Sequence, residues 1–341
     1  MELKSFDLPS ILDKRMAYSI TEGAKMKKFG SIVIRNKRQF ISFTGLPEAV
    51  FEKLLIEFTR ALDSYKWGQY QKNRERRRRR PGAGRRGVLS TPELKLFFIL
   101  FYLKNYPTFD VLGGIFNISA SKAKQNVEKL LPILRQAEQN LKVIPHRKFR
   151  PSLEKNEKNT DKIQEIIIDA TERPRQRPKH SRKQKNYYSG KKHTHTLKNT
   201  IISDGNQGIL VVGPTSPGRH HDYSLLKKEI DPEQPGLSSV DVSVDLGYQG
   251  IKNDYKNFHK IDIPHKKPKK SKTSNPTLTS QQRRENRAIS RKRISVEHLI
   301  GDLKYFHILV NKFRSRAMRV ADQAILVIAG LVNLRNNYAI Q

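Results

Sequence analysis

The sequence predicts an α-helical domain that contains a helix-turn-helix, followed by an α/β domain with a mixed sheet. Between residues 44 and 145 the apolar side chains recur at helical spacing, whereas from residue 163 onward short apolar strands alternate with helices. A polar stretch at 146–162 separates the two patterns and is typical of a linker. A chain of 341 residues is long enough for both units.

The N-terminal segment contains one clear helical pattern. Residues 1–43 are interpreted as an arm, in which 32–34 and 40–43 have the composition of two short strands of a hairpin. Thr44 is expected to cap the helix that follows. The segment 44–89 is therefore expected to hold this helix and, after it, an arginine-rich linker.

The arginine-rich linker has the composition of a phosphate-binding segment. Its like charges repel one another, so it is not expected to fold without a polyanionic partner. A run of this kind, in a chain whose net charge is +35, predicts contact with nucleic-acid phosphates. The arginines expected to make this contact are Arg76, Arg77, Arg78, Arg79, Arg80, Arg85 and Arg86.

Residues 90–145 are predicted to form a helix-turn-helix domain. Ser90 and Glu93 fit a capping box ahead of a strongly apolar helix at 94–103. The helices predicted after it span 109–116 and 120–131, with Ser119 as the cap of the second.

The helix at 120–131 has the division of faces that a recognition helix needs. Its apolar side chains share one side: Ala123, Val127, Leu130 and Leu131. The opposite side carries residues that can reach bases and phosphates in a major groove: Ser121, Lys122, Lys124 and Gln125. A plain helical bundle with a solvated lysine face explains the helices equally well, but the neighbouring arginines and the net charge favour DNA binding.

The segment 163–341 is predicted to form the α/β domain. Five strands are expected in a mixed sheet with flanking helices: 163–169, 194–203, 208–213, 240–245 and 258–263. A helix at 222–230, for which Asp222 is the expected cap, lies between the third and fourth strands. A basic insertion at 265–288 precedes two closing helices, at about 289–306 and 318–337.

The composition narrows the classes of partner and compartment. Lys and Arg number 67 against 32 Asp and Glu, an excess that predicts DNA or RNA as the partner, and the helix-turn-helix favours double-stranded DNA. Cysteine is absent, which excludes disulfides and cysteine-based zinc sites. The longest apolar runs are far shorter than the ~20 residues of a spanning helix, so no membrane partner is expected. We therefore expect a cytoplasmic protein associated with the nucleoid.

Three acids have the placement that metal-dependent phosphodiester chemistry requires. Asp169 and Asp245 each end an apolar strand, and they would lie side by side if the two strands are neighbours. Glu297 lies on a closing helix and shares one face with Arg293 and Lys304. Considered alone, each aspartate is more simply explained as a turn residue. Considered alone, Arg293 and Glu297 are more simply explained as an exposed salt bridge between residues one helical turn apart. Together in a basic chain, they indicate a metal site.

The sequence resembles the bacterial insertion-sequence transposases of the DDE superfamily, in particular the insertion-sequence-five-like group related to the Harbinger transposases. The resemblance spans about residues 44–337. It rests on Pro81-Gly82-Ala83-Gly84-Arg85-Arg86, Leu103-Lys104-Asn105-Tyr106-Pro107-Thr108, Ile168-Asp169-Ala170-Thr171-Glu172-Arg173-Pro174, Tyr188-Ser189-Gly190-Lys191-Lys192, Gly218-Arg219-His220-His221-Asp222, Asp245-Leu246-Gly247-Tyr248-Gln249-Gly250 and Arg293-Ile294-Ser295-Val296-Glu297.

The resemblance implies an RNase H-like fold with Asp169, Asp245 and Glu297 as catalytic acids and metal ligands. It implies two Mg²⁺ ions, for which Mn²⁺ can substitute, terminal inverted repeats as substrate, and a homodimer or larger assembly on paired ends. Related transposases carry a Tyr, Arg, Glu, Lys signature that Arg293, Glu297 and Lys304 match here, with both cations expected to contact DNA. Ser290 stands at the tyrosine position, which is a departure from the signature.

Two other functions fit parts of the same pattern. A catalytically inactive or domesticated DNA-binding regulator would keep the helix-turn-helix, although the intact acid triad argues against it. An RNase H-like nuclease that acts on junctions or hybrids would keep the acids, although a helix-turn-helix suits B-form duplex. The function expected is therefore that of a DNA transposase, which cuts the element ends and transfers their 3′-hydroxyls to target DNA.

Overall fold

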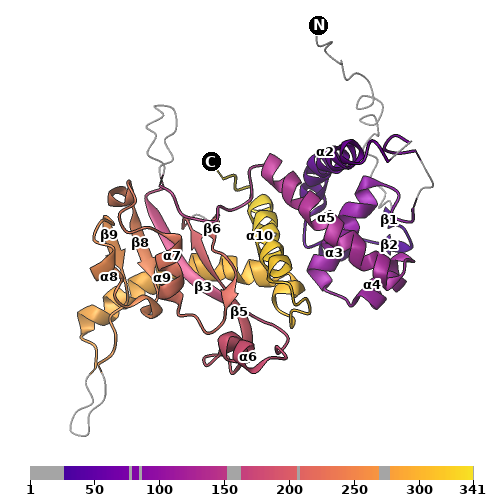
Figure 1. Cartoon of the computed structure of the whole chain (residues 1–341). Coiled ribbons are helices and arrows are strands. Elements are labelled where there is room, and N and C mark those ends of the chain that lie inside the picture. The colour runs from indigo at the N-terminus through magenta and orange to yellow at the C-terminus, as the bar shows by residue number, and fades with distance from the viewer. Residues whose placement is uncertain are drawn as a thin grey trace, which may run out of the picture.

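The computed structural model describes residues 27–76, 79–83, 87–151, 163–205, 208–268 and 277–340. It contains a helical N-terminal unit beside an α/β unit (Figure 1). Most of the expected N-terminal arm lies outside the described residues, and so do Arg77, Arg78, Arg85 and Arg86. Among the helices described, none has the length and apolar character needed to cross a membrane.

The first elements differ from the sequence expectation at 40–43. Strands β1 (Lys27–Phe29) and β2 (Ile32–Ile34) form the hairpin, and helix α1 (Lys37–Thr44) follows. The expected strand at 40–43 is wrong because Asn36 caps a helix: its side chain accepts a hydrogen bond from the Gln39 N–H. Thr44 is the last residue of α1, not a cap, and α2 (Glu48–Lys72) begins after Pro47.

Helix α3 (Pro92–Asn105) is the central helix of the N-terminal unit. Its cap is Thr91, not Ser90, because the Thr91 hydroxyl accepts the Leu94 N–H at 3.1 Å. The apolar residues of α3 lie on all sides of the helix and are buried, which is typical of a helix that other helices enclose.

The helix-turn-helix consists of α4 (Phe109–Phe116) and α5 (Ala120–Asn140), with Ser119 as the cap of α5, as predicted. The turn is tight, since a Cβ on Gly113 would lie 2.5 Å from the Ile118 carbonyl oxygen. Helix α5 continues past the expected end at residue 131 and passes through Pro132. Its apolar side stays buried to Ala137, and this packing carries the helix through the proline.

The sheet is mixed, as predicted. Its five longer strands lie in the order β6-β5-β3-β8-β9, with β8 parallel to β3 and to β9, and β5 antiparallel to β3 and to β6. Two short strands, β4 and β7, pair with other parts of the outer edge of β5. The bounds are β3 (Glu165–Pro174), β4 (Tyr188–Ser189), β5 (Thr194–Ser203), β6 (Ile209–Val212), β7 (Ser216–Pro217), β8 (Asp241–Val244) and β9 (Lys260–Asp262).

Helices cover both faces of the sheet. The face that carries Ile167 and Ile201 packs with α9 and α10, and the face that carries Ile166 and Ile168 packs with residues of α7 and α8. The helices are α6 (Ser181–Tyr187), α7 (Asp222–Glu229), α8 (Ile251–Asp254), α9 (Ser280–Lys304) and α10 (Met318–Arg335). A Thr279–Gln282 capping box starts α9, so the end of the expected basic insertion is helical.

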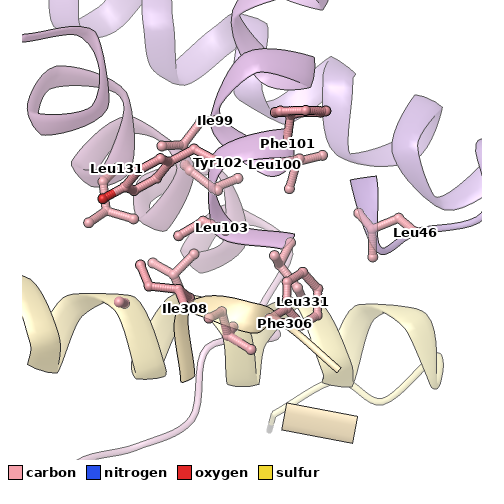
Figure 2. Packing of buried hydrophobic residues seen from close by; sticks show 14 of the residues in the cluster. Leu46, Ile99, Leu100, Phe101, Tyr102, Leu103, Leu131, Phe306, Ile308 and Leu331 are labelled. Carbon is pink, nitrogen blue, oxygen red and sulfur yellow. The ribbon is translucent and has the colours of Figure 1, made fainter. Parts of the chain in front are cut away.

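The two units share one hydrophobic core. Leu103 of α3 lies close to Phe306, Ile308 and Leu331 of the α/β unit (Figure 2), and all four are buried. Polar contacts secure the junction, for example the Lys104 ammonium, which donates to the Tyr305 carbonyl at 2.8 Å. The helix-turn-helix is therefore held in a fixed position relative to the sheet.

The expected linker at 146–162 is packed where it leaves α5. The His146 N–H donates to the Leu210 carbonyl at 2.8 Å, and the His146 carbonyl accepts the Val212 N–H at 3.0 Å. Phe149 is buried with the apolar residues of the sheet. The start of this segment thus belongs to the edge of the sheet beside β6.

Candidate active site

Asp169 and Asp245 lie next to each other on two neighbouring parallel strands. Ile168 of β3 pairs in register with Val244 of β8, and the two aspartates are the residues that follow. Side chains alternate along a strand, so both aspartates project from the sheet face that α9 covers. Asp169 does not end its strand, because β5 pairs with β3 as far as Pro174.

Backbone groups orient the two aspartates. The Asp169 carboxylate accepts the Ala170 N–H at 2.8 Å, and the Asp245 carboxylate accepts the Leu246 N–H at 2.7 Å. Asp245 caps a single helical turn, 246–248, directly after β8. The strand register and these two hydrogen bonds place the pair of carboxylates at one position on the sheet.

Arg293 of α9 reaches both carboxylates. Its Nη2 lies 3.6 Å from Asp169 Oδ2 and its Nη1 lies 3.4 Å from Asp245 Oδ1. The arginine side chain is only 12% exposed. The simpler alternative for this helix, an exposed salt bridge between Arg293 and Glu297, is wrong, because the guanidinium turns toward the sheet.

Glu297 lies one turn after Arg293 on the same flank of α9, and it is exposed. It borders a groove of about 740 Å³ that Arg291, His298 and Asn336 also line. Within the part of the chain that the structure describes, no three acidic or histidine side chains converge closely enough to hold a metal ion. The structure thus brings Asp169, Asp245 and Arg293 together and leaves the Glu297 carboxylate outside this group.

The electrostatics of the pair favour a cation. Burial raises the pKa of Asp169, and the neighbouring Asp245 and Asp222 raise it further, while the Ala170 N–H and Arg293 oppose the shift. The ionised form of Asp169 therefore depends on positive charge nearby. Carboxylate oxygens are the ligands that Mg²⁺ and similar hard ions prefer, so this donor pair fits a divalent metal.

A buried ion network lies on the opposite face of the sheet. Lys198 of β5 is directly across from Glu172 of β3, and its ammonium lies 3.2 Å from that carboxylate and 2.8 Å from Asp222. It also donates to the His220 carbonyl at 2.8 Å. Asp222 is not the cap of α7, which is His221. The network joins the strand that carries Asp169 to the start of α7.

This network was not predicted from the sequence. The sequence feature that could have indicated it is Lys198, a charged residue within a strand whose other residues are mostly buried. Its partner Glu172 is a charged residue in the neighbouring strand. Asp222 also lies near the loop after Asp245, since a Cβ on Gly247 would be 3.6 Å from Asp222 Oδ2. This network therefore lies close to the backbone that follows Asp245.

Apart from Arg293, which faces the two aspartates, the candidate DNA-contacting residues that the structure describes are exposed. On α5 the exposed set is Ser121, Lys122, Lys124 and Gln125, and the opposite apolar side is buried as predicted. Lys304 is exposed in the last turn of α9, and the described arginines of the linker, Arg76, Arg79 and Arg80, are exposed as well. The contacts of the α5 side chains are with other exposed side chains of that helix, such as the Lys122 ammonium with the Gln125 amide at 3.3 Å, so a ligand can reach them.

Two family models match the chain. The model described as DDE superfamily endonuclease matches residues 168–333, a span that includes Asp169, Asp245 and Glu297. The model described as the helix-turn-helix of DDE superfamily endonuclease matches residues 88–137, which include α4 and most of α5. The mixed sheet with its flanking helices is consistent with an RNase H-like domain of this superfamily, as the resemblance implied.

A curated relative matches most of the chain. It is the probable transposase for insertion sequence element IS702 of Microchaete diplosiphon, which is 32% identical over 264 residues. The match covers 76% of this chain and 85% of the relative. No solved structure matches the chain. The family models and this extent of identity show that the chain belongs to the DDE-type transposases of insertion sequences.

Proposed function

We propose that the protein binds the terminal inverted repeats of an insertion sequence, cleaves the ends and transfers their 3′-hydroxyls to target DNA. The observation that carries this proposal is the adjacent Asp169 and Asp245 with Arg293 between them. Two carboxylates on neighbouring strands and a guanidinium on the covering helix suit phosphodiester chemistry, which needs ligands for a cation and a partner for phosphate.

Asp169 and Asp245 would hold a divalent metal ion, Mg²⁺ or Mn²⁺. Glu297, whose carboxylate lies outside this pair in the structure, would complete a second metal position. Such ions activate the attacking oxygen and stabilise the charge that develops on the leaving one. The donor pair fits this role because its backbone hydrogen bonds fix both carboxylates while leaving oxygens free. Arg293 balances their charge until a cation binds.

The first step is hydrolysis at the element end. A water oxygen bonds to the phosphorus, the bond from phosphorus to the 3′ oxygen breaks, and that oxygen leaves as a hydroxyl with a proton from solvent. In the second step the freed 3′-hydroxyl attacks a target phosphate in line, and the target's own 3′ oxygen leaves. Arg293 and Lys304 orient the phosphates through both steps, since orientation contributes much of the rate.

The helix-turn-helix selects the DNA. Gln125 and the lysines of α5 lie on the exposed side of the second helix, which is the side that enters a major groove in this motif. Because the two units share a core, the end sequence read by α5 would be positioned relative to Asp169 and Asp245. The expected working form is a dimer or larger assembly on paired ends in the cytoplasm.

A plasmid assay tests the proposal. Supercoiled plasmid that carries the inverted repeats flanking the reading frame would be incubated with the full chain and Mg²⁺ or Mn²⁺, and nicked and linear forms measured. We expect cleavage at the repeat ends that stops with a chelator and with Asp169→Asn. Specific end binding with no cleavage under any metal would instead support a DNA-binding regulator.

A further inference from the structure

We propose that residues 175–192, called the basic knob below, form a second DNA-binding surface that contacts the backbone of the duplex engaged at the active site. The proposal rests on the proposed function, because it needs DNA at Asp169 and Asp245. The basic knob connects β3 to β5 and contains α6 and β4, at the end of the sheet near β5 (Figure 1).

The charge of this part of the chain is entirely of one sign. From Arg173 to Ser203 the sequence has ten Lys or Arg residues and no Asp or Glu. Seven of the ten are exposed side chains of the basic knob: Arg177, Lys179, Arg182, Lys183, Lys185, Lys191 and Lys192. Like charges gathered on one surface repel one another, so the cluster opposes folding unless a polyanion screens it.

None of these seven cations has an ion pair with an acid among the described residues. Lysines elsewhere in the α/β unit do have such partners: Lys227 lies 2.5 Å from Asp254, and Lys292 lies 2.7 Å from Glu165. These seven charges are therefore not neutralised by an acid in the part of the chain that the structure describes, although Arg177 donates a hydrogen bond to Gln184 at 2.9 Å. The same field lowers the pKa of His195, for which burial is the larger cause and Arg177, Arg175 and Lys312 are the others.

A rigid base holds the cations in place. Arg175 is buried and its guanidinium stacks 3.9 Å from the centre of the Tyr187 ring. The Gln184 amide donates to the Pro178 carbonyl at 2.9 Å, and the Tyr188 strand pairs with His195 of β5. A preorganised cationic surface loses little conformational entropy when it meets phosphates.

The position of the basic knob suits a duplex that reaches the active site. Strand β3 continues five residues from Asp169 to Pro174, roughly 17 Å at the rise of a strand. This is about half of one turn of B-form DNA, which is ~34 Å. The phosphates of a duplex whose cleaved bond lies at Asp169 therefore come within reach of the basic knob, and Tyr188, which is 44% exposed, adds an aromatic surface there.

The test uses the full chain and a labelled duplex of arbitrary sequence, with the dissociation constant measured over a series of salt concentrations. The variant Arg182→Ser/Lys183→Ser/Lys185→Ser removes three exposed charges of α6. Each lost phosphate contact makes the slope of log K against log salt shallower by about 0.9, so we expect a change of about 1 to 3. The matched control, Lys228→Ser/Lys252→Ser/Lys256→Ser, removes three exposed charges at α7 and α8 and should keep the wild-type slope.

A wild-type slope in the α6 variant, or an equal change in the control, would overturn the proposal. Melting temperatures check the fold, and a second variant, Lys191→Ser/Lys192→Ser, repeats the test outside α6 if the first unfolds. Plasmid cleavage by the wild-type chain separates the two claims. Cleavage with an unchanged slope removes the basic knob alone. A changed slope without cleavage keeps the basic knob as a DNA-binding surface and removes the claim that the bound duplex is cleaved at Asp169 and Asp245.

Discussion

The guanidinium of Arg293 lies 3.6 Å from the carboxylate of Asp169, although the two residues come from a helix and a strand more than a hundred positions apart. It reaches Asp245 in the same way at 3.4 Å. Two neighbouring carboxylates repel each other, and a cation between them offsets that repulsion. Arg293 and a metal ion would therefore compete for the same pair of oxygens.

The first prediction concerns the metal ligands. We expect Asp245→Asn to abolish cleavage of the element end and to leave end binding nearly unchanged, because the amide keeps the shape but loses the charge that holds a cation. Gel shift and cleavage should be measured on the same DNA. Asp241→Asn, at the opposite end of β8, is the control and should remain active. Cleavage at the wild-type rate by Asp245→Asn would show that this carboxylate has no catalytic role.

The second prediction concerns the buried network around Lys198. Its side chain is 8% exposed and faces two carboxylates, so Lys198→Met leaves Glu172 and Asp222 without their cation. We expect a loss of about 3–5 kcal/mol in the free energy of unfolding, measured with denaturant. The triple variant Lys198→Met/Glu172→Gln/Asp222→Asn removes all three charges and should recover part of that loss. A triple variant less stable than the single one would contradict the network interpretation.

The third prediction concerns the pH dependence of stability through Glu229. Burial raises the pKa of Glu229 to about 7 from a usual 4.5, and the nearby Thr200 hydroxyl and the charge of Arg147 oppose this shift. The unfolded chain ionises first, so this contribution is complete below about pH 4.5 and is lost as the pH rises through about 7. It is on the order of 3 kcal/mol, from 1.36 kcal/mol for each pH unit.

Glu229→Gln removes this titration. We expect the variant to gain stability relative to wild type as the pH increases from 4.5 to 8, because only the wild type must bury a charge. Thermal unfolding at several pH values measures the difference. The exposed Glu233→Gln is the control and should show no such trend. A difference between Glu229→Gln and wild type that does not vary with pH would exclude this group as the cause.

The fourth prediction tests the fixed junction between the units. Gly45 has φ +80°, and a Cβ there would lie 2.7 Å from the Phe306 ring of the α/β unit. Gly82 has φ +91° but nothing within 4 Å. Both alanine variants lose the left-handed preference of glycine, about 1 kcal/mol, and only Gly45→Ala adds about 1–3 kcal/mol of overpacking. Equal melting temperatures for the two variants would show that Phe306 is free to move away.

Long apolar patterns made much of the fold predictable. The helix at 109–116 and the strand at 194–203 have the predicted bounds, because their apolar spacing and caps agree. The composition of residues 40–43 wrongly indicated a strand. Asn36 and Gly45 are the two caps of a short helix there, and its aromatic side chains are also common in strands. The residues after Asp169 are mostly polar and have no strand pattern in the sequence, yet they pair with β5 as far as Pro174.

The candidate site was predictable in part for the same reason. Asp169 and Asp245 follow short apolar runs, so their adjacency required only that the two strands be neighbours. The partner of Arg293 was not predictable, because spacing along a helix identifies only local pairs such as Arg293 and Glu297. A contact between a helix and a distant strand depends on how α9 crosses the sheet, which the core residues Val296 and Leu299 determine by packing.

The last prediction follows from the position of Arg293. Its charge is shared between two carboxylates, so Arg293→Ala should lower the Mn²⁺ concentration needed for half-maximal binding while slowing cleavage. Tighter metal binding with slower chemistry would be hard to explain for an arginine that only stabilises the fold. Arg293→Lys keeps the charge but loses the two-pronged grip on phosphate, so it should recover little of the rate.

Lys304 provides the comparison, because it lies on the same flank of α9 as Arg293. It is exposed, and it lies about three turns beyond the arginine that contacts Asp169. If both cations orient phosphates, each alanine variant should slow cleavage at least ~10-fold, equivalent to ~1.4 kcal/mol of transition-state stabilisation. Lys304→Ala should leave metal binding and the melting temperature unchanged. Arg284→Ala, an exposed residue on the opposite side of α9, is the control for general loss of charge. Wild-type cleavage rates in both Arg293→Ala and Lys304→Ala would refute a role for this flank of α9 on DNA, whereas slowing in Arg293→Ala alone would confine that role to the cation beside the two aspartates.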